Sequence, residues 1–198
     1  HNIAFLQYGN TMHFAVTNLN DPIVSYDNRT NFVDKMIINP YSDRTCPCGR
    51  RGCVESELTP SATMSKLREV FSAEKTPFLY EAARGSFENV IQDMITMAYE
   101  KDDKAVKEIL NGELTLLAVL LNNLYFSTNP QKIVLHQFKF QNEKAFQKLK
   151  DAVTEIGGAL VSSKIELSII EDKHRFLSGC ALAIRELFFN RGGFDTSS

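Results

Sequence analysis

The chain has 198 residues, 43% of them hydrophobic, and carries a formal net charge of −2 at pH 7. This length supports one well-packed core, and a near-neutral chain lacks the basic surface of a free-standing DNA-binding module. No apolar run approaches the roughly 20 residues that cross a bilayer, and residues 1–3 do not begin a signal peptide. The composition therefore indicates one globular domain without a membrane anchor.

Two short apolar runs near the start, residues 3–6 and 12–17, predict a pair of β-strands. Residues 8–11, Tyr-Gly-Asn-Thr, are typical of the turn in a β-hairpin. A third strand is predicted at residues 22–25, after a cluster of Asn and Asp residues that favours a turn.

Three of the four cysteines, Cys46, Cys48 and Cys53, fall within eight residues in the pattern C-x-C-G-x-x-G-C-x-E. Thiolates are preferred zinc ligands, and a structural zinc site takes four ligands in a tetrahedron. Gly49 and Gly52 let the backbone adopt positive φ and bring the third thiol round. The pattern predicts a structural zinc site with these three cysteines as ligands, in a reducing, cytoplasmic compartment.

The fourth ligand of this site has several candidates. Asp34, Asp43 or a water molecule would complete the tetrahedron, and three reduced thiols without a metal are the alternative. His13 is close in sequence but is not expected to be a ligand. The remaining cysteine, Cys180, lies in an apolar run and is expected to be a small buried side chain.

After the three clustered cysteines, apolar residues recur at helical spacing. Thr59-Pro60-Ser61 is a helix start signal, and a second helix is predicted at residues 86–100 with Ser86 as its cap. The most hydrophobic segment, residues 102–125, predicts a long, central, buried helix. The side chains expected to point inward from the second helix are Val90, Ile91, Met94, Ile95 and Met97.

The last third of the chain alternates strands and helices. Asn129-Pro130 ends the long helix, and the β-branched run at residues 132–135 predicts a buried strand. The elements predicted after it are a helix at 142–156 ended by Gly157-Gly158, a strand at 164–170, a helix at 175–189 and a disordered tail at 191–198.

The cysteine pattern, with Asn39-Pro40 before it, resembles the zinc knuckle of the ROK family. This family groups bacterial sugar kinases with sugar-responsive repressors of the xylose and N-acetylglucosamine type. The resemblance implies an α/β fold for residues 1–190: the C-terminal lobe of such a protein, with a mixed sheet flanked by helices and a zinc-knuckle loop. This is one lobe of the actin-like ATPase, or ribonuclease H-like, fold. The first lobe and a helix-turn-helix domain would then lie N-terminal to this chain.

The resemblance also implies where a sugar would bind. In the family, the Glu and His of an A-G-E-x-G-H segment contact sugar hydroxyls, and the His is the fourth zinc ligand. Here Phe32 occupies the Glu position and Lys35 the His position, while Asn31 lies in the same segment. A third family sugar contact, the Glu of G-C-x-E, is retained as Glu55. The predicted ligand-binding residues are therefore Glu55, Lys35, Asn31 and Phe32.

Two features of the family's kinases are replaced in this chain. The glycine-rich phosphate loop, roughly G-T-G-x-G-x-G, corresponds to residues 8–14, which keep one glycine. The Gly-Gly beside the nucleotide corresponds to His136-Gln137. We therefore expect no enzymatic activity and no catalytic residues.

The expected function is a sugar- or sugar-phosphate-sensing and dimerisation domain of a ROK-type transcriptional regulator. Such a protein forms a homodimer and contacts DNA only through its N-terminal domain. Lys35 favours an anionic effector. The alternatives are a lobe of a divergent ATP-dependent sugar kinase, and a dimerisation module that has lost its sugar pocket.

Overall fold

The computed structural model describes residues 2–9, 11–18, 28–136 and 143–168. The chain divides into two compact units, His1–Leu167 and Ser168–Ser198, and every described helix and strand belongs to the first. The predicted strand at 22–25, the helix at 175–189, Cys180 and the tail at 191–198 lie outside the described residues, so these predictions stand untested.

A four-stranded mixed sheet in the order β2-β1-β3-β4 forms the centre of this unit. Strands β1 (Asn2–Gln7) and β2 (His13–Asn18) are antiparallel, as the hairpin signal predicts. Strand β3 (Lys132–His136) is parallel to β1, and β4 (Ile165–Leu167) is parallel to β3. Alternate side chains of β1 are buried, so one face of the sheet contributes to the core.

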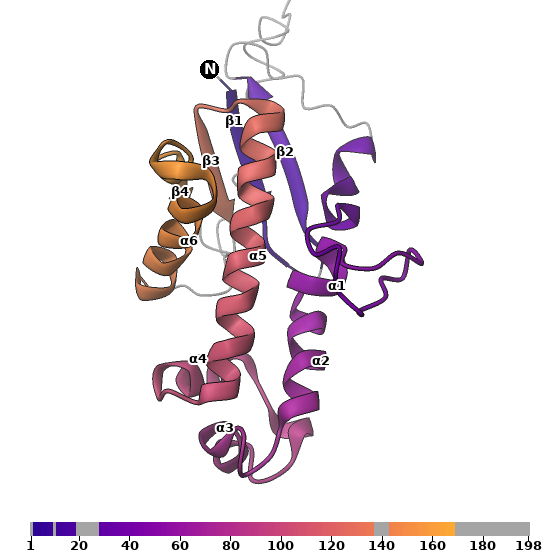
Figure 1. Ribbon diagram of the computed structural model, residues 1–198, viewed down its shortest axis with the longest axis vertical. Helices are drawn as coiled ribbons and strands as arrows, with labels where there is room; N and C mark the ends of the chain where they lie inside the picture. The colour runs from indigo at the N-terminus through magenta and orange to yellow at the C-terminus, as the bar shows by residue number, and fades with distance from the viewer. Residues whose placement is uncertain (1, 10, 19–27, 137–142, 169–198) are drawn as a thin grey trace, which may run out of the picture. The chain divides into compact units, whose positions relative to one another are not determined.

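Helix α5 (Lys104–Thr128) is the central buried helix that the sequence predicts. Figure 1 shows it reaching from the strands to the region of α3 and α4. Its leucines line the core, and Asn129 ends it in the left-handed conformation, φ 43°. Among the described residues, α5 is also the one helix long and apolar enough to span a membrane, contrary to the expectation from the sequence. Half of its most apolar window is buried, as in the core helix of a globular protein.

Helix α6 (Glu143–Ser162) packs against α5 and continues beyond its predicted end. Gly158, at φ 82° and ψ 167°, kinks the helix where Gly157-Gly158 was expected to stop it. Gly157 lies so close to α5 that an added Cβ would be 2.3 Å from Asn122 Oδ1. The glycine pair therefore bends the helix and lets it approach its neighbour, and helical residues resume after the bend.

Short helices connect the hairpin to α5: η1 (Asn28–Lys35), α1 (Val54–Leu58), α2 (Pro60–Val70), α3 (Pro77–Ala82), η2 (Phe87–Asn89) and α4 (Gln92–Glu100). The predicted start of α2 is confirmed, because Thr59 caps it by accepting a hydrogen bond from Ala62 N and Pro60 is its first residue. The helix predicted over 86–100 is wrong in its first half. Val90 and Ile91 are extended and separate η2 from α4, in keeping with the low helix propensity of β-branched residues.

Two side chains in this region differ from the expected roles. Ile91 and Met97, expected to point inward, are 55% and 50% exposed. Asp103 stands at the N-cap position of α5 but makes no capping bond there. Its Oδ2 instead accepts a hydrogen bond from Leu79 N of α3 at 2.9 Å, so this carboxylate joins two helices.

A buried ionic cluster joins α1, α2 and α5. Lys66 Nζ lies 3.4 Å from Glu57 Oε2 and 3.2 Å from Glu113 Oε1, and both carboxylate side chains are less than 5% exposed. Thr63 Oγ1 donates to Glu113 at 2.9 Å. Glu113 lies within the apolar stripe of α5, between Leu110 and Leu114, and this position in the sequence already indicates a buried carboxylate.

Candidate metal centre

The loop that carries the three cysteines is held in place by backbone hydrogen bonds. Cys46 N donates to Arg50 O at 2.7 Å, and Gly49 N donates to Cys46 O at 2.8 Å. Gly49 and Gly52 adopt positive φ, 84° and 67°, as the pattern predicts. A Cβ at position 52 would lie 1.7 Å from Asn39 O, so only glycine lets the loop come this close to the preceding segment.

The loop leads directly into helix α1. Val54 N donates to Met36 O at 2.9 Å, and Ile37 pairs with Cys53 in an isolated β-bridge. Cys53 is the N-cap residue of α1, and its carbonyl accepts from Ser56 N at 3.0 Å. The knuckle, the segment that precedes it and the start of α1 thus form one connected unit.

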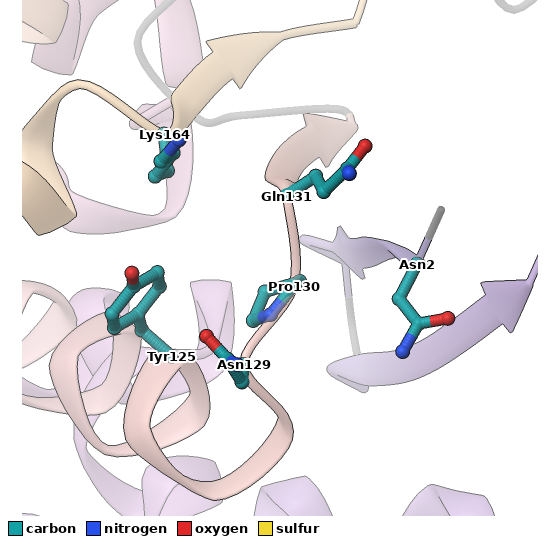
Figure 2. A pocket seen from close by; sticks show the side chains of 6 residues that line it. All are labelled: Asn2, Tyr125, Asn129, Pro130, Gln131 and Lys164. Atoms are coloured by element: carbon teal, nitrogen blue, oxygen red, sulfur yellow. The ribbon is translucent and has the colours of Figure 1, made fainter.

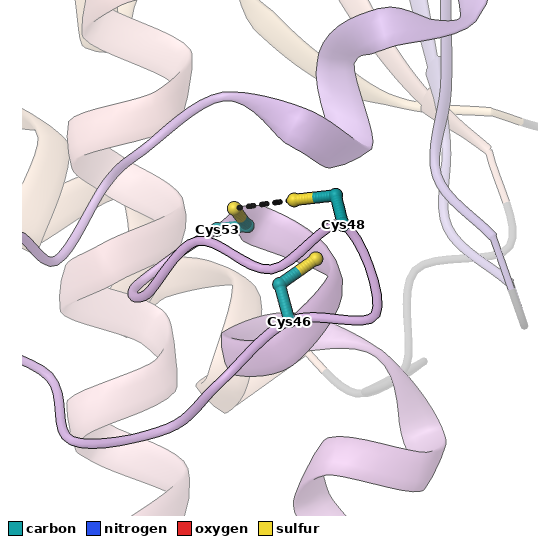
Figure 3. Close-up of side chains that lie close together, drawn as sticks. All are labelled: Cys46, Cys48 and Cys53. Carbon is teal, nitrogen blue, oxygen red and sulfur yellow. Dashed lines mark hydrogen bonds between the residues drawn. The ribbon is translucent and has the colours of Figure 1, made fainter.

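The sulfur atoms of Cys46, Cys48 and Cys53 all lie within 4.8 Å of one another, and Figure 3 shows them gathered on one side of the loop. The Cys48 and Cys53 sulfurs are 3.7 Å apart. In a tetrahedral zinc site with Zn–S bonds of about 2.3 Å, neighbouring sulfurs are about 3.8 Å apart. The donor set therefore fits a tetrahedral thiolate-binding metal such as zinc.

The three thiols differ in their surroundings. Cys46 and Cys53 are buried and Cys48 is exposed. Burial raises the pKa of Cys46 to about 12 and also raises the pKa of Cys53. Hydrogen bonding to Arg50 lowers the pKa of Cys48 to about 6. Because a metal binds thiolates, loading the two buried cysteines must release their protons.

The structure does not gather the expected fourth ligands around the sulfurs. Among the described residues, the mutually close set contains the three sulfurs alone. Asp43 is fully exposed and lies 3.9 Å from Arg51. Asp34 lies 3.2 Å from Lys35 Nζ, and His13 Nε2 is 2.8 Å from Thr11 Oγ1. None of these three side chains is therefore placed as a fourth ligand, and both a water molecule and the metal-free cluster of three thiols stay predictions.

Two of the predicted ligand-binding residues meet beside this cluster. Lys35 Nζ donates to Glu55 Oε2, and the Cys46 thiol lies 3.1 Å from the same carboxylate oxygen. These contacts hold the pKa of Glu55 below its usual value, with the hydrogen bond from Lys35 as the main cause. The carboxylate in turn raises the pKa of Lys35. Both side chains keep more than a fifth of their surface exposed.

The other two predicted ligand-binding residues are not brought into this group. The Phe32 side chain is 63% exposed and projects from η1. The backbone of Asn31 belongs to η1, but its side chain lies outside the described residues.

Arg50 was not among the predicted site residues, and Asp34, predicted as a candidate fourth ligand, has a different partner. Arg50 donates to Lys35 O at 2.9 Å and hydrogen-bonds Cys48, so it joins the knuckle to the segment that carries Lys35. Asp34 is buried beside Lys35 as its second carboxylate partner, not as a metal ligand. A basic residue inside the cysteine pattern and an Asp-Lys pair before it were the available signals.

Two large side chains from the turn between β1 and β2 are buried in the core. Tyr8 is 7% exposed and Met12 is fully buried, and both belong to the hydrophobic core. The Tyr8 hydroxyl donates to Leu58 O at the end of α1. Tyr8 N also donates to His136 O at 2.9 Å, which links this turn to the end of β3.

A polar pocket of about 390 Å³ lies at the C-terminal end of α5. Figure 2 shows the Tyr125 and Lys164 side chains on one side of it, with Gln131 and Asn2 on the other. The residues that line the pocket come from other elements than the knuckle, so it is separate from the cysteine cluster.

Comparisons with known proteins place this geometry in a family context. The sequence model of the ROK family matches residues 34–174. A ROK hexokinase from Thermus thermophilus has a TM-score of 0.69 at 12% identity, over 93% of this chain and 58% of that chain. A ROK family protein from Streptococcus pneumoniae in complex with sucrose has a TM-score of 0.69 at 13% identity, over 94% and 59%. A ROK family transcriptional regulator, a homologue of E. coli MLC, has a TM-score of 0.61 at 16% identity, over 84% and 41%.

These identities show the fold alone. The chain is a mixed α/β lobe of the actin-like ATPase fold, with helices flanking a mixed sheet and a three-cysteine cluster that could hold a metal. It spans between 41% and 59% of the length of the three structures. No curated protein sequence matches it significantly.

Proposed function

The chain belongs to the ROK family, and from that premise we propose that it is the effector-sensing and dimerisation lobe of a bacterial transcriptional regulator, without kinase activity. The effector is a sugar or sugar phosphate. The protein is a cytoplasmic homodimer and contacts DNA through a separate N-terminal domain. Effector binding shifts the dimer between arrangements that favour or disfavour DNA binding.

The packing of Tyr8 and Met12 carries this proposal. A phosphate cradle needs backbone amides that the phosphate oxygens can approach, which is why glycine predominates in such loops. Here the turn between β1 and β2 instead sends two large side chains into the core. Because phosphoryl transfer depends mainly on positioning and charge neutralisation, the loss of the cradle removes most of what this lobe contributes to it.

The effector site proposed is the region of Lys35 and Glu55. An ammonium and a carboxylate in contact, both partly exposed, can exchange hydrogen bonds with the hydroxyl and phosphate groups of a ligand. The positive charge of Lys35 favours a phosphorylated sugar. Asn31 and Phe32 belong to the segment that would contact it.

Zinc has a structural role in this proposal. Cys46, Cys48 and Cys53 would hold the ion, with water as the fourth ligand, and so fix the loop that leads into α1. Because Glu55 is two residues after Cys53, the metal would set the position of the effector-binding carboxylate.

The first test uses the full-length gene product with neutral and phosphorylated hexoses. We expect a concentration-dependent thermal shift that is larger for the phosphorylated sugars, and no sugar-dependent consumption of ATP. Tighter binding of the neutral sugar would contradict the role given to Lys35. No shift with any sugar would favour the dimerisation module, and size-exclusion chromatography with light scattering would then test the homodimer.

The second candidate function is a divergent ATP-dependent sugar kinase. It is favoured by the hexokinase among the similar structures, which matches this chain as well as the sucrose-bound protein does. Sugar-dependent ADP formation by the full-length protein, lost when ATP is omitted, would establish it and overturn the regulator.

A further inference from the structure

Exposure differs sharply within the cysteine cluster. Cys48 is open to solvent, while its neighbour Cys53 is buried with 0% of its surface exposed. The two sulfurs are in contact, 3.7 Å apart (Figure 3). One sulfur is therefore reachable by a small reagent and has a second sulfur directly behind it.

The third thiol, Cys46, has a carboxylate partner in addition to the two other cysteines. Cys46 Sγ lies 3.1 Å from Glu55 Oε2 and donates to this carboxylate. Cys46 is also 1% exposed, so a reagent in solvent does not reach it first. The cluster thus contains an accessible cysteine, a buried partner in contact with it, and a third, buried cysteine that also donates to a carboxylate.

We propose that Cys48 and Cys53 are a thiol oxidation site, at which a hydroperoxide converts the pair to a disulfide. This goes beyond effector sensing, because the reaction needs no sugar and no DNA. It uses the same sulfurs as the metal, so oxidation and metal binding exclude each other.

The reaction proceeds in two steps. Cys48 loses its proton to solvent, and its sulfur attacks the outer oxygen of the hydroperoxide, so that an S–O bond forms and the O–O bond breaks. The departing alkoxide takes a proton and leaves as an alcohol, or as water from hydrogen peroxide. Cys53 then loses its proton and attacks the Cys48 sulfenic acid, an S–S bond forms, and the S–O bond breaks to release water. Two thiols are oxidised and one hydroperoxide is reduced.

The local backbone allows the required movement. Cys48 is followed by Gly49, which adopts φ 84° and has open space around it. Cys53 is fixed by its place at the start of α1, so Cys48 would move toward Cys53 to close the bond. The disulfide would also leave Cys48 and Cys53 without thiolates to offer, so a metal held by all three cysteines would be lost.

The test oxidises the chelator-treated protein with hydrogen peroxide, blocks the remaining thiols with N-ethylmaleimide and maps the peptides by mass spectrometry. We expect a Cys48–Cys53 disulfide and the loss of two of the four alkylatable thiols. A dithiol reductant should restore both. Over-oxidation of Cys48 without a disulfide, a disulfide that omits Cys48, or four unreacted thiols would overturn the proposal.

Matched variants separate the roles of the cysteines. Cys46→Ser should still form the disulfide, Cys48→Ser should form none, and Cys53→Ser should stop at a sulfenic acid that a 1,3-dione traps. Circular dichroism of each variant shows whether it is folded. Because folding of a variant is not assured, the wild-type protein supplies a second measurement: when loaded with zinc, it should release one zinc ion per disulfide to a chromophoric chelator. Oxidation with the zinc retained would count against the shared site.

The outcome is independent of the effector. Failure of the disulfide to form overturns the oxidation site and leaves sugar binding by the reduced protein untouched. Failure of every sugar to bind the reduced protein overturns the proposed effector and leaves the oxidation site standing.

Discussion

Lys35 donates a hydrogen bond to Glu55 from twenty positions earlier in the chain, and the same carboxylate oxygen lies against the Cys46 thiol. One carboxylate thus connects the segment that precedes the knuckle to the knuckle itself. Since Lys35 also lies 3.2 Å from Asp34, the ammonium bridges two acidic side chains. The candidate metal centre and the candidate effector site are therefore in direct contact, through Cys46 and Glu55.

Replacing this ammonium should weaken the fold at neutral pH and have a smaller effect in acid. The Lys35 contact holds the pKa of Glu55 below its usual value of about 4.5, so its contribution to stability is complete above that value and disappears as the pH falls through the lowered pKa. For Lys35→Met we expect a loss of about 0.5–1 kcal/mol at pH 7, since the pair is partly exposed. Urea unfolding at pH 7 and pH 3 measures this difference.

The control for Lys35→Met is Lys75→Met, at an exposed position with no ion pair recorded to a described residue. It should change the free energy of unfolding by less than about 0.5 kcal/mol at either pH. An equal loss from Lys35→Met at both pH values would show that the lysine acts through packing and not through Glu55.

Gly52→Ala should prevent the knuckle from forming its present loop. The new Cβ would meet Asn39 O at 1.7 Å, and φ 67° is itself unfavourable for alanine. We expect a loss of about 3 kcal/mol or more together with loss of metal binding. Thermal unfolding and zinc titration measure the two effects.

Two other glycines serve as controls for Gly52→Ala. Gly49→Ala meets open space and should cost only about 1–2 kcal/mol for its positive φ. Gly112→Ala, on an exposed position of α5 with nothing nearby, should stabilise the protein by about 0.5–1 kcal/mol. A similar loss for positions 49 and 52 would mean that the close approach to Asn39 is not what requires glycine.

Zinc affinity should rise with pH. The pKa of Cys46 is near 12 and that of Cys53 is also raised, so binding releases about two protons near neutrality and the apparent affinity should increase about 100-fold per pH unit. Competition with a chromophoric chelator at pH 6.5, 7.0 and 7.5 measures this slope. We expect one zinc per chain by elemental analysis, and a pH-independent affinity would indicate that the buried thiols are not the ligands.

Lys66→Met should be among the most destabilising single substitutions in the described part of the chain. It removes the cation that lies between the buried carboxylates Glu57 and Glu113, which costs about 3–5 kcal/mol when one partner of a buried pair is lost. The control is Arg68→Met on the same helix, where the pair with Glu88 is exposed and screened by solvent, so the expected loss is much smaller. Glu113→Gln added to Lys66→Met should recover part of the loss.

The sequence predicts the elements whose signals are local. The hairpin, the start of α2 at Thr59-Pro60 and the end of α5 at Asn129 are all set by neighbouring residues, and the structure confirms them. The cysteine pattern likewise predicts that three thiols meet, because Gly49 and Gly52 turn the chain within eight residues. The prediction of one helix over 86–100 is wrong because hydrophobic periodicity alone does not reveal that Val90 and Ile91 are extended.

The contacts that depend on tertiary structure could not be predicted in this way. Lys35 reaches Glu55 because Val54 N bonds to Met36 O across the knuckle, and no spacing rule reports that bond. From the sequence, Asp103 would be expected to cap its own helix, whereas in the structure its carboxylate accepts a hydrogen bond from Leu79 N of α3. From the sequence, Glu113 only interrupts the apolar stripe of α5, whereas in the structure it forms an ion pair with Lys66 of α2. In each case the partner comes from a different element.

Strand β1 is the first strand of the chain and yet lies inside the sheet, between β2 and β3. Phe5 pairs with Val134, so 129 residues must be synthesised after the first strand before its parallel neighbour exists. During translation the hairpin would emerge with one edge unpaired, and an unpaired edge can join other chains. Closing so long a loop is also slow. Production of this lobe should therefore benefit from slow synthesis at low temperature or from a chaperone that covers the edge of β1 until β3 arrives.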